Sequence, residues 1–305
     1  AELDRDALAM DLRAARLSLG ASVARAWFDV VEGRAQVVLA EQLVANLSAH
    51  LGSLERGYRS GLYSAADVQL ARSNLSSEQS RSIERERILG DRQRTLEIML
   101  GRYPAAQIAA AGDQLSLPAL PPAVPVGVPS SLLERRADIA AAQRRLQGAA
   151  LRRTSAHADR FPKFSLTASA GNSSAELSDL LKGSSAVWSL LGNLIQPLID
   201  GGRREAVETQ AAARVTQAEA RYVEVVLQAF SEVEGALEQE RRVREQLVAL
   251  GESLVAAERV EALTVEEYQS GIANTLAMLE VKRRTFAARS SLLDARWRQL
   301  RNRIN

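Results

Sequence analysis

Few side chains in this sequence have the type and spacing that chemistry requires. The chain has 305 residues, no cysteine and only two histidines, His50 and His157. Without cysteine, thiol nucleophiles, disulfides and zinc–thiolate sites are excluded. Neither histidine has a partner at the spacing of a metal site, so both are interpreted as helix-surface residues and no metal site is predicted.

The other candidate motifs are incomplete as well. The Asp-Gly-Gly sequence at 200–202 lacks the lysine and the spacing of a phosphate-binding loop, and is better interpreted as a strand-to-helix turn. The acidic pairs Glu232/Glu234 and Glu266/Glu267 lie in helical patterns, where positions one or two apart do not face each other. No serine lies in a nucleophile elbow. The sequence therefore gives almost no support for an enzyme, and it predicts no cofactor.

Charged residues alternate in sign along the chain. The 39 Lys and Arg residues nearly balance the 37 Asp and Glu residues, as in the Glu-Arg-Glu-Arg sequence at 84–87. This pattern is typical of solvated helix faces and predicts no nucleic-acid-binding surface. The sequence has no apolar run of about 18 residues, the length of a transmembrane helix. It also shows no signal peptide, so we expect a mature or truncated piece of a protein.

Prolines divide the sequence into segments. Six of the eight prolines lie between 104 and 129, and the other two are Pro162 and Pro197. Because proline is excluded from helix interiors, the remaining segments are predicted to be long helices. The predicted divisions are a helical hairpin at 1–103, a proline-rich connector at 104–130, a helix at 131–160, a strand pair at 161–200, and a long helix, tight turn and return helix at 201–305.

Capping residues mark the predicted helix ends. Gly61 suits a helix C-terminus, and Asp67 lies favourably near the start of the next helix, which is predicted to end near Arg102. Ser131 is a good N-cap for a helix that ends near Asp159.

The segment from 161 to 200 alternates with a period of two. The polar positions of its first half are Lys163, Ser165, Thr167 and Ser169. In its second half, Trp188, Leu190 and Leu194 share one parity, whereas Ser189 and Asn193 share the other. Two strands of about ten residues would fit either a transmembrane β-barrel or a soluble hairpin packed on the helices, and the pattern leaves both open.

The longest helical pattern runs from residue 203 to about 268. A helix of this length would extend about 100 Å, too long for a globular domain. It carries two adjacent apolar stripes, one through Ala211 and Val215 and one through Val223 and Val226. A two-stranded coiled coil needs only one seam, so this helix is predicted to have a neighbour on each side, as in a closed wall of helices.

The sequence also contains an internal repeat. The Tyr-Arg-Ser-Gly-Leu sequence at 58–62 recurs as Tyr-Gln-Ser-Gly-Ile at 268–272. The chain is therefore interpreted as two copies of long helix, tight turn and shorter helix. A strand pair precedes only the second copy, so we expect another pair before Ala1.

Several motifs occur together in a specific order. They are Arg136–Ile139 followed by Gln143 and Leu146, Phe161–Leu166, Pro197–Gly202, and Tyr268–Gly271 running into Leu279–Arg283. With these motifs the chain resembles the TolC-like outer-membrane factors, the exit ducts of tripartite efflux pumps and type I secretion systems. Ala137 and Gln143 depart from the usual Pro and Glu of that family, which affects a local turn and not the fold.

The resemblance implies a mainly α fold, in which a long-helix protomer contributes a transmembrane β-hairpin to a trimeric β-barrel and its helices to a periplasmic α-barrel. The proline-rich connector would then cross the equator of the α-barrel. Lys163, Ser165, Thr167 and Ser169 would face the watery lumen of the β-barrel, while the other parity meets lipid. Because only one strand pair is present, we expect the segment 163–200 to be displaced or disordered in this chain.

Both glycine turns would lie at the periplasmic tip, which adaptor proteins contact and which constricts the resting tunnel. The resemblance assigns this tip to Tyr58, Gly61, Asp67, Tyr268, Gly271 and Glu280. By motif position, Tyr268 and Glu280 match residues that close the tip, with Asp67 beside them. Glu267 stands where a family member has a basic residue, so that particular ionic latch is not expected.

The implied function is a passive outer-membrane exit duct in a Gram-negative bacterium, conducting small toxic compounds or drugs, with most of the chain in the periplasm. The implied partners are two further copies in a homotrimer, a periplasmic adaptor protein, an inner-membrane pump and outer-membrane lipid, with no nucleic acid. The alternatives are an exit duct for type I protein secretion and, from another class, a soluble coiled-coil scaffold without a pore.

Overall fold

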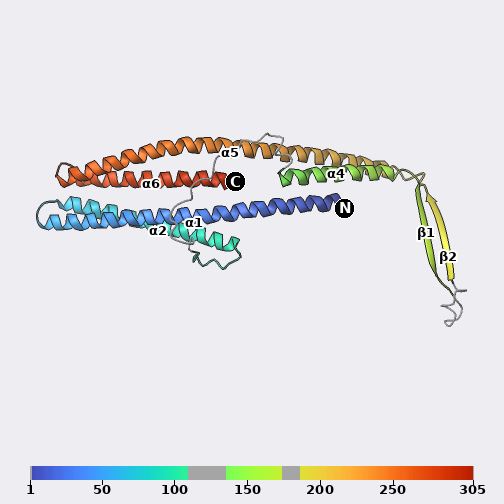
Figure 1. Ribbon diagram of the computed structural model, residues 1–305, viewed down its shortest axis with the longest axis horizontal. Helices are drawn as coiled ribbons and strands as arrows, with labels where there is room; N and C mark the ends of the chain where they lie inside the picture. The colour runs from blue at the N-terminus through green and yellow to red at the C-terminus, as the bar shows by residue number, and fades with distance from the viewer. Residues whose placement is uncertain (1, 109–134, 174–185, 305) are drawn as a thin grey trace. The chain divides into compact units, whose positions relative to one another are not determined.

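The computed structural model describes residues 2–108, 135–173 and 186–304, which form long helices and one β-hairpin (Figure 1). The elements are α1 (Glu2–Arg59), α2 (Ala65–Met99), α4 (Ala137–Ala158), β1 (Lys163–Asn172), β2 (Ala186–Ile195), α5 (Arg203–Gln269) and α6 (Thr275–Ile304). The chain divides into two compact units, the first made of Ala1–Ala14 with Gly127–Phe230 and the second of Ala15–Val126 with Ser231–Asn305. Helices α1 and α5 each contribute residues to both units.

The predicted long helices are confirmed, with 58 residues in α1 and 67 in α5. Helix α2 ends at Met99 and not near Arg102. Gly101 adopts a left-handed φ of 69°, which allows the Arg102 N–H to donate to the Glu97 carbonyl at 2.8 Å and closes the helix. The predicted cap at Ser131 and the connector beyond residue 108 lie outside the described residues.

A hydrophobic cluster holds α1, α2 and α6 together in the second unit. Leu54 of α1 is fully buried, and Leu279 of α6 joins the same cluster. Its other buried members are Leu43, Leu47, Val68, Ala71 and Leu75. These residues recur at spacings of three, four or seven along α1 and α2, so each helix presents one apolar stripe to the cluster.

A buried polar network crosses the same three helices. Arg92 of α2 forms an ion pair with Glu32 of α1, whose side chain is only 4% exposed. The Gln36 amide donates to the Glu32 carboxylate at 2.9 Å and to the Ser290 carbonyl of α6 at 3.2 Å. The Ser290 hydroxyl donates in turn to the Gln36 side-chain oxygen at 2.8 Å. Because buried charges are stable only when paired, this network fixes the register of the helices.

The start of the connector is anchored to α2 by the carboxylate of Glu97. This carboxylate accepts hydrogen bonds from the backbone N–H groups of Ala106, Gln107 and Ile108 at 2.8, 2.8 and 3.1 Å. Burial acts to raise the pKa of Glu97, but the backbone donors outweigh it and lower the pKa. Residues 106–108 are therefore fixed against the end of α2.

In the first unit, ion pairs join α4 to its two neighbours. Arg145 and Arg152 of α4 pair with Asp11 and Asp4 of α1. Towards α5, the Glu208 carboxylate accepts from Arg160 at 2.7 Å and contacts His157 at 2.9 Å. His157 is thus an exposed helix residue paired with an acid.

The β-hairpin is antiparallel, with Phe164 opposite Leu194 and Ser165 opposite Asn193. Because side chains alternate along both strands, this register places the apolar parities of the two strands on one face. The expectation that 163–200 is displaced or disordered is wrong for the described strands, which pair over ten residues each. A soluble hairpin packed on the helices is wrong too, since every residue of both strands is exposed.

Among the helices that the structure describes, none combines the length and the hydropathy needed to cross a bilayer.

The buried network predicts the effect of removing Arg92. Arg92→Met keeps most of the side chain's length but leaves Glu32 buried without its cation, so we expect a loss of about 3 kcal/mol in the free energy of unfolding. Arg87 of α2 pairs with Glu84 and Asp91 on the exposed surface, and Arg87→Met should leave stability unchanged. Thermal unfolding followed by circular dichroism measures both. Equal stabilities of the two variants would contradict this role of the network.

Candidate functional site

The turns between α1 and α2 and between α5 and α6 have the same backbone geometry, and both lie at one end of the second unit (Figure 1). Gly61 and Gly271 adopt left-handed φ values of 79° and 73°. In each turn the next residue bonds back across the helix end: the Leu62 N–H donates to the Gly57 carbonyl, and the Ile272 N–H to the Glu267 carbonyl, both at 2.8 Å. The predicted repeat is therefore a structural one, and its glycines are required by the turn.

The helix that follows each turn begins with a side-chain cap. Ser64 accepts from the Asp67 N–H at 3.2 Å, and the Asp67 carboxylate accepts from the Ser64 N–H at 3.1 Å. The Ser64 hydroxyl lies 2.6 Å from the Asp67 carboxylate, and donation from this hydroxyl and from the Ser64 N–H lowers the pKa of Asp67. In the second repeat, Asn274 accepts from the Ala277 N–H at 2.9 Å. Both return helices are thus started by local hydrogen bonds.

Aromatic rings from the two repeats meet beside these turns. Tyr63 stacks on Tyr268 with 6.3 Å between ring centroids and 5° between planes. The His50 ring meets Tyr268 edge-on at 5.3 Å. Burial, together with hydrogen bonding to Tyr63, raises the pKa of Tyr268 to about 12. The phenol therefore stays neutral at physiological pH and joins the two helical hairpins without charge.

The glycine at position 57 makes room for this cluster. A Cβ atom on Gly57 would lie 2.4 Å from a ring carbon of Tyr63, so any larger residue displaces the ring. At the matching position the second repeat has Glu267, and in place of Tyr63 it has Ala273. At the position of Tyr63, therefore, only the first repeat has an aromatic ring.

The predicted tip residues separate into two groups. Asp67 and Tyr268 share a neighbour, since the hydroxyl of the buried Thr275 interacts with both. Glu280 instead pairs with Arg283 of its own helix at 2.8 Å. Tyr58 is about half exposed on the last turn of α1.

Two members of this cluster, Tyr63 and His50, were not predicted from the sequence to lie at the tip. The glycine at 57, one helical turn and a loop before Tyr63, is the signal that could have indicated the close approach of the Tyr63 ring. No local pattern links His50 to Tyr268, because they lie on helices from different repeats.

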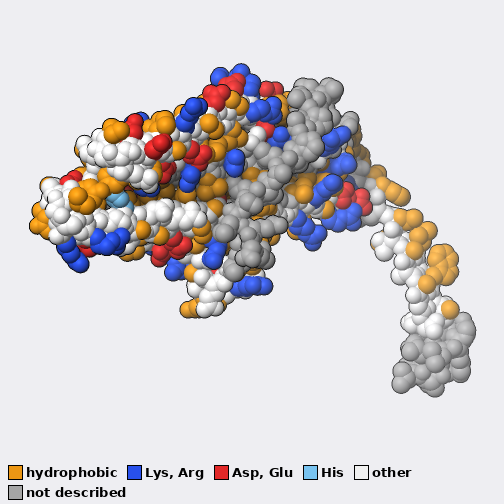
Figure 2. Space-filling model, turned by 60° about the vertical axis from the view of Figure 1, so that its left-hand side comes forward, with side chains coloured by type: hydrophobic (Ala, Val, Ile, Leu, Met, Phe, Trp, Pro, Cys, Tyr) orange, Lys and Arg blue, Asp and Glu red, His pale blue; other side chains and the backbone are white. Residues whose placement is uncertain are grey.

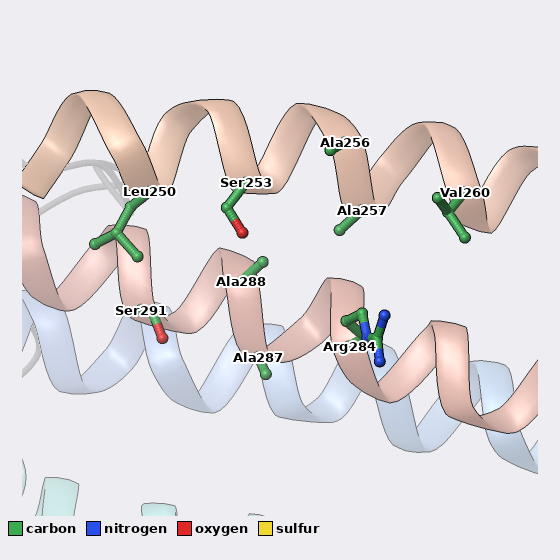
Figure 3. A pocket seen from close by; sticks show the side chains of 9 residues that line it. All are labelled: Leu250, Ser253, Ala256, Ala257, Val260, Arg284, Ala287, Ala288 and Ser291. Atoms are coloured by element: carbon green, nitrogen blue, oxygen red, sulfur yellow. The ribbon is translucent and has the colours of Figure 1, made fainter.

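A groove of about 420 Å³ runs between α5 and α6 (Figure 3). Leu250, Val260 and Arg284 border it. The rest of its lining is small: Ser253, Ala256, Ala257, Ala287, Ala288 and Ser291. Small side chains on both walls leave space for the approach of another helix.

The second candidate site is the hairpin. One face carries Phe164, Leu166, Leu190 and Trp188, and Figure 2 shows hydrophobic side chains along one side of the strands. All four residues predicted to face the lumen, Lys163, Ser165, Thr167 and Ser169, lie on the opposite face. There Ser169 and Ser189 share a hydrogen bond of 2.7 Å across the strands.

Within residues 2–108, 135–173 and 186–304, no three His, Cys, Asp or Glu side chains gather as they would around a metal ion.

Long paired helices with repeated turns, joined to a two-faced β-hairpin, define a protomer of the α-barrel fold class. The model of the outer membrane efflux protein family matches residues 1–102 and 128–305, so the chain belongs to this family. The predicted fold class is confirmed by solved channels of the family. A membrane protein from Pseudomonas aeruginosa superposes with a TM-score of 0.89 at 30% identity, covering 99% of this chain and 69% of that one.

Curated relatives are efflux proteins. OprJ of Pseudomonas aeruginosa is 34% identical over 285 residues, which cover 92% of this chain and 59% of OprJ. The cation efflux protein CusC of Escherichia coli K12 is 28% identical over 297 residues, covering 96% of this chain and 64% of CusC. A solved CusC structure superposes with a TM-score of 0.83 at 27% identity, covering 99% of this chain and 70% of that structure. The chain thus spans about three fifths of the length of the curated relatives.

The Gly57 contact predicts a difference between two otherwise similar substitutions. Alanine is the better helix former by about 1 kcal/mol, and at Gly52 its Cβ would meet only the Arg56 guanidinium, at 3.6 Å. Gly57→Ala forces Tyr63 off Tyr268, so we expect it to be less stable than Gly52→Ala by about 1 kcal/mol. Denaturant unfolding measures the difference, which should vanish in a Tyr63→Ala background. A difference that persists there would place its cause elsewhere.

Proposed function

We propose that this chain forms part of the outer-membrane exit duct of a tripartite export system, which conducts small toxic compounds passively to the exterior. The observation that carries this proposal is the hairpin, whose two faces differ in polarity and whose strand residues are all exposed. An isolated two-stranded hairpin is marginal in water, whereas neighbouring strands of a closed barrel would satisfy its edges. A soluble scaffold gives these strands no role.

The hairpin has the features of barrel strands. Its apolar face would meet lipid, and Lys163, Ser165, Thr167 and Ser169 would line the lumen. Phe164 lies at one end of that apolar face and Trp188 near the other, as expected for the aromatic girdles at the two membrane interfaces.

The long helices support assembly into a homotrimer. Of the 67 residues of α5, four are buried: Ala229, Val243, Ala257 and Thr264. Apolar side chains on α5 that are 44–66% exposed are Val207, Val223, Leu227, Val248, Val255, Val260 and Leu263. One seam of α5 therefore packs within the chain while apolar surface remains for a second copy, as in a closed wall of helices. The small-residue groove in Figure 3 is suited to such close packing.

The names of the relatives favour efflux over protein secretion. They include an antibiotic efflux pump outer membrane protein and a toluene efflux pump outer membrane protein, both from Pseudomonas putida. We assign 104–130 to the equator of the α-barrel and the helical hairpins to the periplasm. The proposed partners are an adaptor protein and an inner-membrane pump. The pump would supply the energy, so this chain needs no catalytic site.

The two turns form the periplasmic tip in this proposal. Tyr58, Gly61, Asp67, Tyr268, Gly271 and Glu280 would hold it closed or contact the adaptor. The contacts of Tyr268 with Tyr63 and His50 support a closing role, since they join the two repeats within one copy.

The conductance of single channels tests both the duct and its tip. The full-length protein that carries this chain should form channels in planar lipid bilayers. Tyr268→Ala should raise their conductance several-fold, because it removes the ring contacts that join the two repeats. Glu280→Ala should raise it as well, because in the proposal Glu280, which pairs with Arg283 within one copy, would contact a neighbouring copy in the closed trimer. Tyr103→Ala, at an exposed tyrosine after α2, is the matched control and should change nothing. Unchanged conductance in both tip variants would refute the gate, and an absence of channels would refute the duct.

Adjacent positions on β1 test the orientation of the hairpin. Leu166→Lys places a charge on the proposed lipid face and should cost about 2–4 kcal/mol near the bilayer centre. Thr167→Lys places the same charge in the lumen, where water solvates it, and should allow normal insertion with altered ion selectivity. Heat-modifiable migration of the full-length protein from outer membranes reports insertion. If Leu166→Lys inserted normally and Thr167→Lys did not, the assignment of the two faces would be reversed.

A further inference from the structure

His50 has an unusual environment for a histidine. Its Nε2 atom is buried and has no hydrogen-bond partner among the described residues. Its ring packs edge-on against Tyr268, which in turn stacks on Tyr63. The imidazole therefore lies between α1 and the last turns of α5, at the contact that joins the two repeats. A neutral imidazole ring is stable at this position because it needs no counter-ion.

The charged groups around this ring favour its neutral form. Lys282 of α6 acts on it electrostatically and is held at 3.5 Å by Glu261 of α5. Asp67, at the start of α2, faces Tyr268 and is engaged by Ser64. Burial first, and the charge of Lys282 second, lower the pKa of His50 below its ordinary value. A protonated His50 would add a second positive charge near Lys282, whose carboxylate partner is Glu261.

We propose that His50 makes closure of the tip sensitive to acid, because protonation of its imidazole drives α1 away from the end of α5. This rests on the proposed tip gate and names a regulation of that same site. In the separated state water solvates the imidazolium, and Tyr268 loses its edge contact with the ring. The two repeats differ at this position. When Tyr58 is aligned with Tyr268, Val260 of the second repeat takes the position of His50. Only the first repeat carries a titratable group here.

The sign of the effect follows from the two states. The solvated ring in the separated state has an ordinary pKa near 6.5, and the ring in the closed state has a lower one. The closed state is therefore favoured above about pH 6.5 and loses that advantage as the pH falls through the interval between the two pKa values. Each unit of difference between the two pKa values shifts the closed–open equilibrium by up to about tenfold.

The test is single-channel recording of the full-length protein in planar bilayers between about pH 7.5 and about pH 5.5, the range in which histidine titrates. We expect the open fraction to rise several-fold on acidification. His50→Gln and His50→Val should abolish this rise, the second with the residue that the other repeat carries. His157→Gln is the matched control and should keep it, because that histidine is exposed and paired with Glu208. Lys282→Gln should make the rise smaller and complete it at a higher pH, because removing a like charge raises the pKa of His50 in the closed state towards its ordinary value.

A wild-type channel whose open fraction ignores pH, or a rise that persists in both His50 variants, would overturn the proposal. A protein that forms no channels at any pH contradicts the duct instead. In that case NMR titration of the imidazole still decides the matter for His50. The proposal requires a pKa below about 6.5, together with a shift of the Tyr268 resonances as His50 titrates. An ordinary pKa, or Tyr268 resonances that stay unchanged, would overturn it.

Discussion

The long helices expose more apolar surface than the described residues of this chain bury. Helix α5 buries only four of its 67 residues, and its exposed valines and leucines follow the helix along both units. A monomer stabilised by apolar burial alone would leave these helices loosely held. The second unit instead fixes its helices through the buried pair of Arg92 and Glu32 and through small clusters around Leu54. The apolar surface that remains on α5 is suited to packing against further helices, as the proposed assembly requires.

Periodicity was enough to predict the elements of this chain but not the contacts between them. The helical spacing, the proline-free segments and the alternation after Pro162 predicted the long helices and the side-chain faces of the hairpin, and Gly61 and Gly271 marked the turns. These signals are local. The meeting of His50 with Tyr268 and the anchoring of 106–108 by Glu97 join parts that no repeat spacing relates. The pairing of Glu280 with Arg283 is itself local, but a motif position could not distinguish it from a contact across the tip.

The cluster beside the two turns joins the repeats chiefly through uncharged groups. Glu267 supplies no basic group beside Tyr268, and Tyr268 contacts the rings of Tyr63 and His50 and the hydroxyl of Thr275. Such contacts depend on ring packing and burial, so salt screens them little. They are also few. A partner helix that offers equivalent contacts to each hairpin could replace them at small net cost, which is what a reversible closure requires.

The backbone groups of the β-hairpin and those of the two turns obtain their hydrogen-bond partners in different ways. In a membrane every backbone N–H and C=O of the strands needs a partner, so the edges of β1 and β2 must be paired permanently and their register cannot vary. The turns have no such demand, because the Gly61 and Gly271 hydrogen bonds and the caps at Ser64 and Asn274 satisfy their backbone locally. Each helical hairpin would therefore keep its own structure on separating from its neighbour. In the proposed duct, local hydrogen bonding at the turns would allow the tip to change its contacts while the strands hold the assembly fixed.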